Sequence, residues 1–527
     1  MLTEKAARMN SFMATLQNTV IGNNAAEIIF FLFKIAEAML EPSVRLYIYQ
    51  SVCLQNYPMA SICFTRIEDE DDSERERYIQ ESSATYIIAY KVLINLPAIV
   101  LGLFCGAWSD KIGRKLPVML PCLGTIFAVL FYMLSVLDGM PTIPLVLLGA
   151  FLRGAFGKSA IITMALHSYI ADLSSREQRT SRFGKLLAMN YFGFFVGSMA
   201  AGALLEISTF DIIFCAVIFI DCLCVFVALI FMKESLFKAT TAEEEADTKK
   251  SSNPFKVEHI RDSLNVLIKP RENGARWHLL ALFSTILLNQ MSKSGEVDIT
   301  LLFVERYPLR WEKQLYGYLL ATDYACLGIS VFFLLPILSS GFAIHDMTLI
   351  LVGLFFKIIR LIIIACSRTT ALVFLSVVVG CPSALIISGA KSLISKIVAE
   401  DEIGKTFSLL SCGETVANMI GSLVLTGVYS ALTPYFAGST FLLASGINAV
   451  WLLIMMLLYK DIKSLTTYKL LDEEKTKSSY GSREEIPKCD STNTMNGVKP
   501  MLIEERPHNG KECKKTFDFR QLSIEDG

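Results

Sequence analysis

The chain has 527 residues, of which 53% are hydrophobic and only 19% are charged, whereas soluble domains carry roughly 25% charged residues. This excess of apolar residues excludes an ordinary soluble globular protein and indicates one that is solvated by lipid. The net charge of −1 lacks the basic excess with which nucleic-acid binders displace counterions from phosphates, so nucleic acid is not expected as a partner.

Apolar stretches of about 20 residues recur along the chain between charged residues or Gly and Pro. A helix of this length, about 20 residues, crosses the hydrocarbon core of a bilayer. We therefore predict an all-α polytopic membrane protein with twelve transmembrane helices. The expected spans are residues 26–50, 84–107, 117–137, 144–170, 184–205, 212–232, 277–303, 315–338, 347–366, 371–395, 408–430 and 439–459.

A polar stretch, residues 233–276, separates the sixth and seventh expected spans. It is rich in Glu, Lys and Ser and has too little apolar surface to fold by itself. The predicted organisation is an N-terminal segment (1–25), a six-helix bundle (26–232), a central loop (233–276), a second six-helix bundle (277–459) and a disordered tail (460–527).

Basic residues concentrate in the central loop and in the short links after the second and fourth spans, whereas the loop 51–83 carries the acidic run Glu68 to Asp72. Cytoplasmic loops of membrane proteins are enriched in Lys and Arg. We therefore expect both termini and the central loop to face the cytoplasm.

The link after the second span reads Gly106-Ala-Trp-Ser-Asp110-Lys111-Ile-Gly113-Arg114-Lys115 and fits the pattern G-x-x-x-D-[RK]-x-G-R-[KR] at every fixed position. It resembles the signature loop of major facilitator transporters, which are built from two six-helix halves. The resemblance implies that the glycines let two helices approach. It also implies that Asp110 and Arg114 pair across the two bundles and latch one conformation.

Two further links resemble each other. Asp172 and Arg179 follow the fourth span, and Glu400 to Lys405 follow the tenth, which is the corresponding place in the second half. In both links an acid precedes a base. Parallel repeats in a transporter predict such internal symmetry, so we interpret Asp172 and Arg179 as further gating residues.

Several stretches resemble a narrower group, the solute-carrier family of the proton-coupled folate transporter, also called the haem carrier family. These are Leu101 to Asp110, Tyr169 to Thr180, Leu315 to Tyr318 and Ser395 to Ser408. The resemblance covers the membrane region, without the central loop and the tail. It implies proton-driven import, or lysosomal export, of anionic organic molecules such as folates and bacterial cell-wall fragments.

The sequence departs from the folate transporter where that protein has functional charges. Its acidic residues in the fourth and fifth spans, its histidine in the seventh and its arginine in the tenth are replaced here by Lys158, Leu187, Lys293 and Lys391. These replacements argue against folate itself and against that transporter's proton relay.

The first span contains Lys34, Glu37, Glu41 and Arg45, which fall on one stripe of a helix turning about 100° per residue. Lys34 can pair with Glu37, and Glu41 with Arg45. Glu37 and Glu41 are four residues apart and can titrate as a coupled pair, as a proton-coupling site requires. The alternative is a self-neutralised stripe with no role in transport.

The seventh span carries a polar segment from Asn289 to Asp298. It predicts a discontinuous helix, a feature of transporter binding sites. Lys293 is expected to pair with Glu296, which leaves Asp298 as a second proton acceptor. The proton-coupling candidates are therefore Glu37, Glu41, Glu296 and Asp298.

Further cations lie in the fourth and tenth spans. If Lys158, Lys293 and Lys391 face a central cavity, its field is strongly positive and favours an anionic substrate. In the alternative, Arg153 and Lys158 pair internally with Asp221 or Glu414. The substrate-binding candidates are Lys34, Arg153, Lys158, Lys293 and Lys391, whereas we interpret His167, Asp221 and Asp323 as structural.

Two expectations concern the loops and the tail. Cys53 and Cys63 can form a disulfide in an oxidising compartment. Tyr468-Lys-Leu-Leu471 fits a Tyr-x-x-apolar sorting signal, which would recruit a sorting adaptor to an endosomal or lysosomal membrane; the plasma membrane is the alternative.

The sequence thus predicts a secondary active transporter that moves a small organic anion, folate-like or muropeptide-like, by proton-coupled alternating access. Its partners are the substrate, protons and the lipid bilayer. We expect no enzymatic activity, cofactor or metal site, because no phosphate-cradling loop, HExxH or GxSxG motif is present. The alternatives are a proton-independent organic-anion facilitator or exchanger and a transporter-like receptor that moves nothing.

Overall fold

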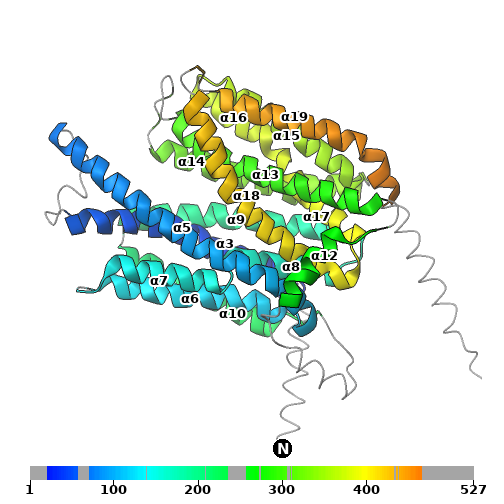
Figure 1. Cartoon of the computed structure of the whole chain (residues 1–527), viewed down its shortest axis with the longest axis horizontal. Helices are drawn as coiled ribbons and strands as arrows, with labels where there is room; N and C mark the ends of the chain where they lie inside the picture. The colour runs from blue at the N-terminus through cyan, green and yellow to red at the C-terminus, as the bar shows by residue number, and fades with distance from the viewer. Residues whose placement is uncertain are drawn as a thin grey trace, which may run out of the picture. The chain divides into compact units, whose positions relative to one another are not determined.

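The computed structural model describes residues 20–56, 70–137, 139–207, 209–235, 257–271, 274–304, 309, 311, 313–342, 344–432, 435–436 and 438–465. These residues fold as helices without any strand (Figure 1). Residues Met1–Glu473 belong to one compact unit. The predicted sorting signal at Tyr468 and nearly all of the predicted tail lie outside the described residues.

The helices of the first half are α2 (Val20–Asn23), α3 (Ala25–Asn56), α5 (Glu70–Ile112), α6 (Lys115–Val136), α7 (Thr142–Ala155), α8 (Lys158–Leu173), α9 (Arg179–Ile207) and α10 (Phe210–Phe231). The central loop contains α12 (Val257–Ile268). The second half contains α13 (Ala275–Val304), α14 (Lys313–Ile329), η2 (Ser330–Leu334), η3 (Ile337–Gly341), α15 (Asp346–Ala365), α16 (Thr370–Gly380), η4 (Cys381–Ala384), α17 (Leu385–Ile397), η5 (Glu400–Glu402), α18 (Ile403–Leu432) and α19 (Ser439–Leu457).

Each of the twelve expected spans coincides with one helix or a run of helices. Ten helices in the described part of the chain are long and apolar enough to cross a bilayer. The first and seventh expected spans, α3 and α13, are also helices of 32 and 30 residues, but both carry charged side chains near their middle. The all-α multi-pass architecture is therefore confirmed.

The two halves share one packing plan. In the first half α3 packs along α9, and in the second half α13 packs along α18, so the first and fifth spans of each half are partners. The halves meet where α5 lies along α18, α8 against α18, and α9 against α14 and α17 (Figure 1).

Large apolar side chains point outward from many helices, as on α10, where Phe219 is 70% exposed. Such outward faces are expected of a protein surrounded by lipid.

The helix breaks lie in the fourth and tenth spans, and the predicted discontinuity in the seventh span is wrong. Helix α13 runs without interruption through its polar segment. The fourth span is instead divided between α7 and α8 at Gly157, whose φ of 87° favours glycine, and at Lys158, whose φ of 45° is uncommon for a side chain with a Cβ. The tenth span passes from α16 through the short 3₁₀ helix η4, which contains Pro382, into α17.

These two interruptions occupy corresponding places in the two halves. Interrupted spans at equivalent positions of parallel or inverted repeats are a pointer to a transporter's binding site. The polar segment of α13 remains helical because its side chains find partners on other helices, described below, so the backbone does not have to supply polar groups.

The central loop and the start of the predicted tail both contain helix. The central loop contains α12, an amphipathic helix that packs against α5 and α18; it folds because these helices bury its apolar face. The predicted tail begins too early, since residues 459–465 are helical and bury Ile462 and Leu465.

Charged hydrogen bonds hold the segment after α12 to the second half. Lys269 and Arg271 donate to the two carboxylate oxygens of Glu402 at 3.0 and 2.6 Å. Burial acts to raise the pKa of the Glu402 carboxyl, but these hydrogen bonds outweigh it and hold this pKa below its ordinary value. The stabilisation is therefore complete above the ordinary glutamate pKa and is lost as the pH falls through the lowered folded-state value.

We expect Glu402→Gln to loosen α12 from the bundle. A hydrogen bond to a charged group contributes roughly 1.5–3 kcal/mol, and a neutral partner less, so amide exchange in residues 257–268 should quicken about tenfold at neutral pH. Hydrogen-exchange mass spectrometry measures this, with the exposed neighbour Glu400→Gln as control. Unchanged exchange in Glu402→Gln would show that apolar packing alone holds α12.

Candidate functional site

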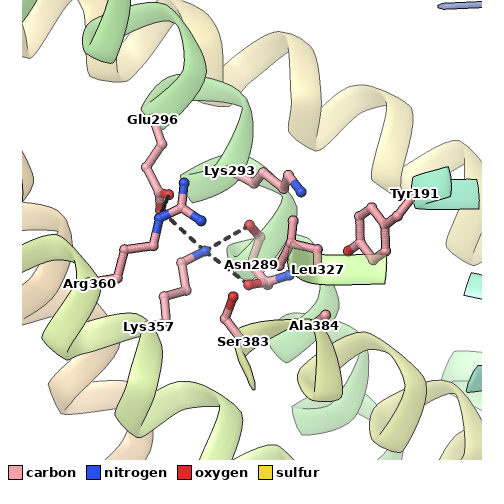
Figure 2. A pocket seen from close by; sticks show the side chains of 9 residues that line it. All are labelled: Tyr191, Asn289, Lys293, Glu296, Leu327, Lys357, Arg360, Ser383 and Ala384. Carbon is pink, nitrogen blue, oxygen red and sulfur yellow. Dashed lines mark hydrogen bonds and ion pairs between the residues drawn. The ribbon is translucent and has the colours of Figure 1, made fainter. Parts of the chain in front are cut away.

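Two adjoining cavities lie among the helices of the second half, with one wall from the first half. The first is lined by Tyr191, Asn289, Lys293, Glu296, Leu327, Lys357, Arg360, Ser383 and Ala384 (Figure 2). The second is lined by Lys293, Glu296, Val297, Thr300, Tyr316, Leu319, Leu320, Asp323, Arg360, Ile364 and Val377. They share Lys293, Glu296 and Arg360, so they form one polar region, which we call the central site.

The central site contains more cations than carboxylates. Glu296 lies 3.4 Å from the Lys357 ammonium and 3.8 Å from the Arg360 guanidinium, and accepts a hydrogen bond from Ser292. Arg360 also pairs with Asp323 at 2.6 Å. Lys357 donates to the side chain of Asn289 at 2.9 Å.

Lys293 is the third cation of the central site and is held differently. Its ammonium lies 4.7 Å from the ring centre of Tyr191 and 5.6 Å from that of Tyr324. Among the described residues no carboxylate lies within 4 Å of it, so the predicted pair of Lys293 with Glu296 is wrong. Figure 2 shows Lys293 extending toward Tyr191, while Arg360 reaches Glu296. Lys293 thus offers a positive charge in a site rimmed by aromatic rings.

A second charged cluster lies in the first half around Glu41. Its carboxylate binds Arg153 at 3.0 Å and Lys158 at 2.9 Å, and lies 3.8 Å from Arg45. The expected contact of Glu41 with Arg45 is present, but the shorter contacts come from the interrupted fourth span. The alternative in which Arg153 and Lys158 pair with Asp221 or Glu414 is wrong.

The remaining predicted residues form pairs of their own. Lys34 binds Glu37 at 2.7 Å, as predicted, and donates to Ser159. Its ammonium also lies over three rings, those of Phe30, Phe33 and Phe194. Lys391 pairs with Glu414 at 3.0 Å. Asp298 accepts a hydrogen bond from Ser422.

These pairs revise the predicted cavity field. Of Lys158, Lys293 and Lys391, only Lys293 lines the cavities of the central site. Lys158 and Lys391 are instead paired with Glu41 and Glu414. The second and third cations come instead from α15, as Lys357 and Arg360, which the sequence reasoning missed. The rule that an ionisable residue inside a span needs a role or a partner would have found both, and also Asp323.

The signature loop lies where one end of both bundles meets. Arg114, 1% exposed, binds Asp110 at 2.6 Å and Asp172 at 3.0 Å. All three belong to the first half, so the predicted pairing of Asp110 with Arg114 across the bundles is wrong. Burial acts to lower the pKa of Arg114, but Asp110 and Asp172 outweigh it and raise this pKa above its ordinary value, which keeps the guanidinium charged.

Asp110 reaches the second half in another way. A Cβ added at Gly404 would overlap the Asp110 carboxylate, so this carboxylate sits directly at the start of α18. Negative charge is stabilised at a helix N-terminus by the helix dipole. Asp110 therefore contacts the second half at Gly404.

The glycines of the signature loop permit this approach. A Cβ at Gly106 would overlap Ser408 of α18, and Ser408 donates a hydrogen bond to the carbonyl of Gly102. Gly113 has a φ of 116°, in the region that glycine alone adopts readily. The predicted role of these glycines in helix approach thus has a geometric basis.

Side chains of the first half also cross to the end of α17. Arg179 donates to the Ser395 carbonyl at 2.6 Å, and Arg176 donates to the Lys396 carbonyl at 3.0 Å. Cations stabilise the negative end of a helix dipole. We call the end of the bundles formed by Asp110, Arg114, Asp172, Arg179 and Gly404 the signature end.

A buried polar cluster at the signature end was not predicted. Thr180 of α9 donates to Asp346 at 2.7 Å, and Asp346 also binds Lys396 at 2.6 Å and Ser392 at 2.8 Å. Asp346 is the first residue of α15. It follows the loop after the eighth span, which has no clean copy of the first-half signature. Only the position of that loop, equivalent to the signature loop in the second half, could have indicated it.

Cys53 is disulfide-bonded, and its predicted partner Cys63 lies outside the described residues.

The chain is similar in sequence and in structure to known proteins. Residues 28–365 match the model of the Major Facilitator Superfamily. The chain is 23% identical over 433 residues to the lysosomal proton-coupled steroid conjugate and bile acid symporter SLC46A3 of Gallus gallus, covering 80% of this chain and 90% of that protein. It is 26% identical over 369 residues to the proton-coupled folate transporter of Rattus norvegicus, covering 68% and 76%.

Among solved structures, the crystal structure of the human organic anion transporter MFSD10 (TETRAN) superposes with a TM-score of 0.64 at 15% identity. The match covers 82% of this chain and 98% of that one. The shared feature at this identity is the fold.

We expect Glu41→Gln to destabilise the first half. It leaves Arg153, 0% exposed, and Lys158 without their carboxylate, and breaking a buried pair costs about 3–5 kcal/mol. Thermal unfolding in detergent should show a clearly lower midpoint than for wild type.

Asp298→Asn is the matched control, because its carboxylate accepts from a serine hydroxyl and the amide keeps an acceptor. A midpoint for Glu41→Gln equal to that of Asp298→Asn would mean that the Glu41 cluster does not stabilise the fold.

Proposed function

The chain belongs to the Major Facilitator Superfamily and is a multi-pass membrane transporter, and we propose that it moves a small organic anion by proton-coupled symport with alternating access. The observation that carries this proposal is the charge of the central site. Lys293, Lys357 and Arg360 face Glu296 and Asp323, so the formal charge is +3 − 2 = +1. A cation surplus inside low-dielectric walls attracts an anion.

Lys293 is the group we assign to the substrate's acidic moiety. The other two cations are engaged by carboxylates, whereas Lys293 contacts aromatic faces, which an anion can replace without breaking an ion pair. Phe194 stacks on Tyr324 with ring centres 5.3 Å apart, so flat apolar surface lies next to this charge. A substrate with a ring system and an acidic group fits both features, as do the steroid conjugates and folate that the two relatives carry.

Glu296 is the group we assign to the proton. Its contacts with Lys357 and Arg360 are long, at 3.4 and 3.8 Å. Protonation of Glu296 would raise the formal charge of the central site from +1 to +2 and free Lys357 for the substrate anion. Proton and anion would then bind together, which is the requirement for symport.

The other proposed proton acceptors are less suited. Glu37 and Glu41 each have a cation within 3.0 Å, and Asp298 is not part of either cavity lining. Glu37 is closely paired with Lys34, and Glu41 with Lys158. If Glu296 proves not to titrate, this neutralisation favours the alternative, a proton-independent facilitator or exchanger. A receptor that binds without transport is the third possibility.

The signature end provides the gate in this proposal. Asp110 at the start of α18, Arg179 at the end of α17 and the Thr180–Asp346–Lys396 cluster close this end between the halves. Transport would require these contacts to separate while the opposite end closes, as alternating access demands.

We further propose that the signature end is cytoplasmic, with both termini on that side. Basic residues concentrate in the links at this end, as they do in cytoplasmic loops of membrane proteins. The membrane would be the plasma membrane or that of endosomes and lysosomes. The Tyr468 motif and the lysosomal relative favour the latter.

We expect Glu296→Gln to reduce gradient-driven accumulation at least tenfold. Exchange of substrate across the membrane should continue in this variant. The amide imitates the protonated acid and removes the titrating group. Purified protein in proteoliposomes is tested with labelled folates, bile acids and muropeptides, with and without an inward proton gradient, and then in counterflow.

The matched control is Asp298→Asn, two residues away on the same helix, which should remain gradient-driven. Gradient-independent flux in wild type would identify a facilitator. Binding without flux of any of these compounds would identify the receptor alternative.

We expect Lys293→Gln to raise the KM for the anion at least tenfold, because a charge-assisted contact of about 1.5–3 kcal/mol is lost. Lys293→Arg keeps the charge and should retain most of the affinity. Equal KM values for wild type and Lys293→Gln would place the anion elsewhere.

We expect Gly404→Ala to open the signature end. Its Cβ collides with Asp110, and overpacking costs roughly 1–3 kcal/mol, enough to shift the conformational equilibrium about tenfold. Spin labels at the exposed residues Glu177 and Glu400, after replacement of exposed cysteines, should report a longer distance. Gly427→Ala on the same helix meets nothing within 4 Å and should leave the distance unchanged.

A further inference from the structure

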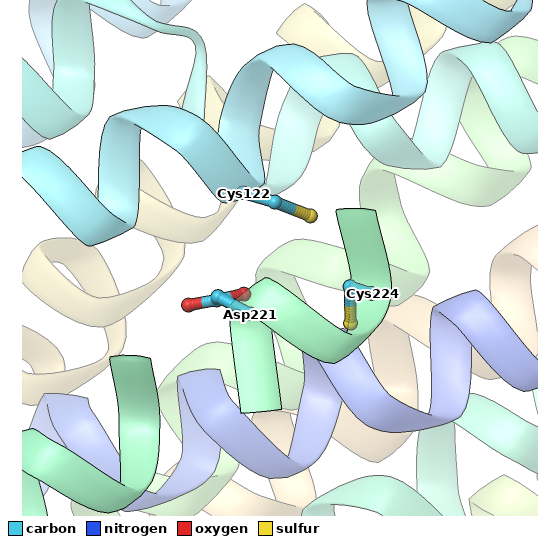
Figure 3. Close-up of side chains that lie close together, drawn as sticks. All are labelled: Cys122, Asp221 and Cys224. Carbon is cyan, nitrogen blue, oxygen red and sulfur yellow. The ribbon is translucent and has the colours of Figure 1, made fainter. Parts of the chain in front are cut away.

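Three side chains with metal-binding atoms meet in the core of the first half, away from the central site. They are Cys122 of α6 and Asp221 and Cys224 of α10, whose Sγ and carboxylate oxygen atoms all lie within 4.8 Å of one another (Figure 3). In the described part of the chain this is the only group of three such residues. Asp221 and Cys224 are three residues apart and share one face of α10, and α6 packs against that face.

The carboxylate of Asp221 is the unusual member. The residue is 0% exposed, and neither oxygen has a hydrogen bond in this structure. The other carboxylates near the middle of the spans, such as Glu41 and Glu296, all have charged or hydroxyl partners. A buried polar group without a hydrogen-bond partner is unfavourable, so the two oxygens of Asp221 are available to a ligand.

The two thiols supply such a ligand's other contacts. Cys122 is 1% and Cys224 0% exposed. Each thiol reaches a backbone carbonyl, at 3.9 and 3.8 Å, and the two thiols also lie within hydrogen-bond reach of each other. These contacts are weak and would be released easily. Two thiolates and one carboxylate form a donor set that suits Zn²⁺.

We propose that Cys122, Asp221 and Cys224 bind one Zn²⁺ ion between α6 and α10. Ligand atoms around tetrahedral zinc lie about 3.5–3.8 Å apart, given bond lengths of about 2.0–2.3 Å, so the observed separations, all within 4.8 Å, need to close by about 1.3 Å at most. Rotation of the cysteine side chains supplies this. Three protein ligands leave a fourth position open. The ion joins two helices of the first half and replaces the missing partner of Asp221.

The sequence could not reveal this site, and the expectation of no metal is revised by the proposal. Cys122 is about 100 residues from Asp221 in the chain, so no spacing motif exists. The sequence also predicts Asp221 to be structural.

The test uses the full-length chain, purified and stripped of metal with a chelator. Elemental analysis after incubation with Zn²⁺ should give one ion per chain, and Co²⁺ as a spectroscopic probe should produce a thiolate-to-cobalt charge-transfer band. Cys122→Ser, Asp221→Asn and Cys224→Ser should each weaken zinc binding more than about 100-fold, since even second-shell changes cost 10–100-fold. Zn²⁺ should raise the unfolding temperature of wild type but not of these three variants.

Cys105→Ser is the matched control, because Cys105 is an equally buried cysteine, 1% exposed, outside the cluster; its zinc binding should equal that of wild type. If the three variants fold poorly, X-ray absorption at the zinc edge of wild type decides the question. Two sulfur neighbours at about 2.3 Å support the site. An absence of binding, a shell of nitrogen and oxygen alone, or binding that survives in all three variants overturns it.

Discussion

An ionised side chain inside a bilayer normally needs an opposite charge within the protein, and this constraint organises both halves of the molecule. On insertion scales the isolated charge costs about 2.5–3.5 kcal/mol. Glu41 satisfies it by holding Arg153 and Lys158, and Glu296 by approaching Lys357 and Arg360. Each cluster ties several helices together, so the charges that make transport possible also decide which helices are neighbours.

The two clusters differ in a way that suits different tasks. The ion pairs of Glu41 are short and involve a fully buried arginine, so the cluster is a fixed joint of the first half. The contacts of Glu296 are longer, and the empty space beside it is shared with the uncompensated Lys293. A site that has to bind and release an ion needs this weaker arrangement.

The sequence predicted the helices well and the partners of the charges poorly. Apolar length is a local property, so all twelve spans could be placed, and the signature loop was recognisable from fixed positions. A charge pair between helices depends instead on where each helix is interrupted and how it is rotated. Arg153 and Lys158 reach Glu41 because the fourth span breaks at Gly157. The sequence predicts the break in the seventh span instead, because polar residues are densest there. Lys357 and Arg360 were overlooked because they stand in a strongly apolar span.

The π-helical turns of η2 and η3 have a consequence for how the two halves are compared. The hydrogen bonds of a π turn span one more residue than those of an α turn. Each extra residue rotates the helix that follows by about 100° about its axis. Residues after Ser330 in the eighth span therefore cannot be matched to the second span by counting. The repeats keep equivalent faces only if the alignment admits an insertion at each of these turns, so an ungapped superposition of the halves would assign lipid-facing positions of one half to the interior of the other.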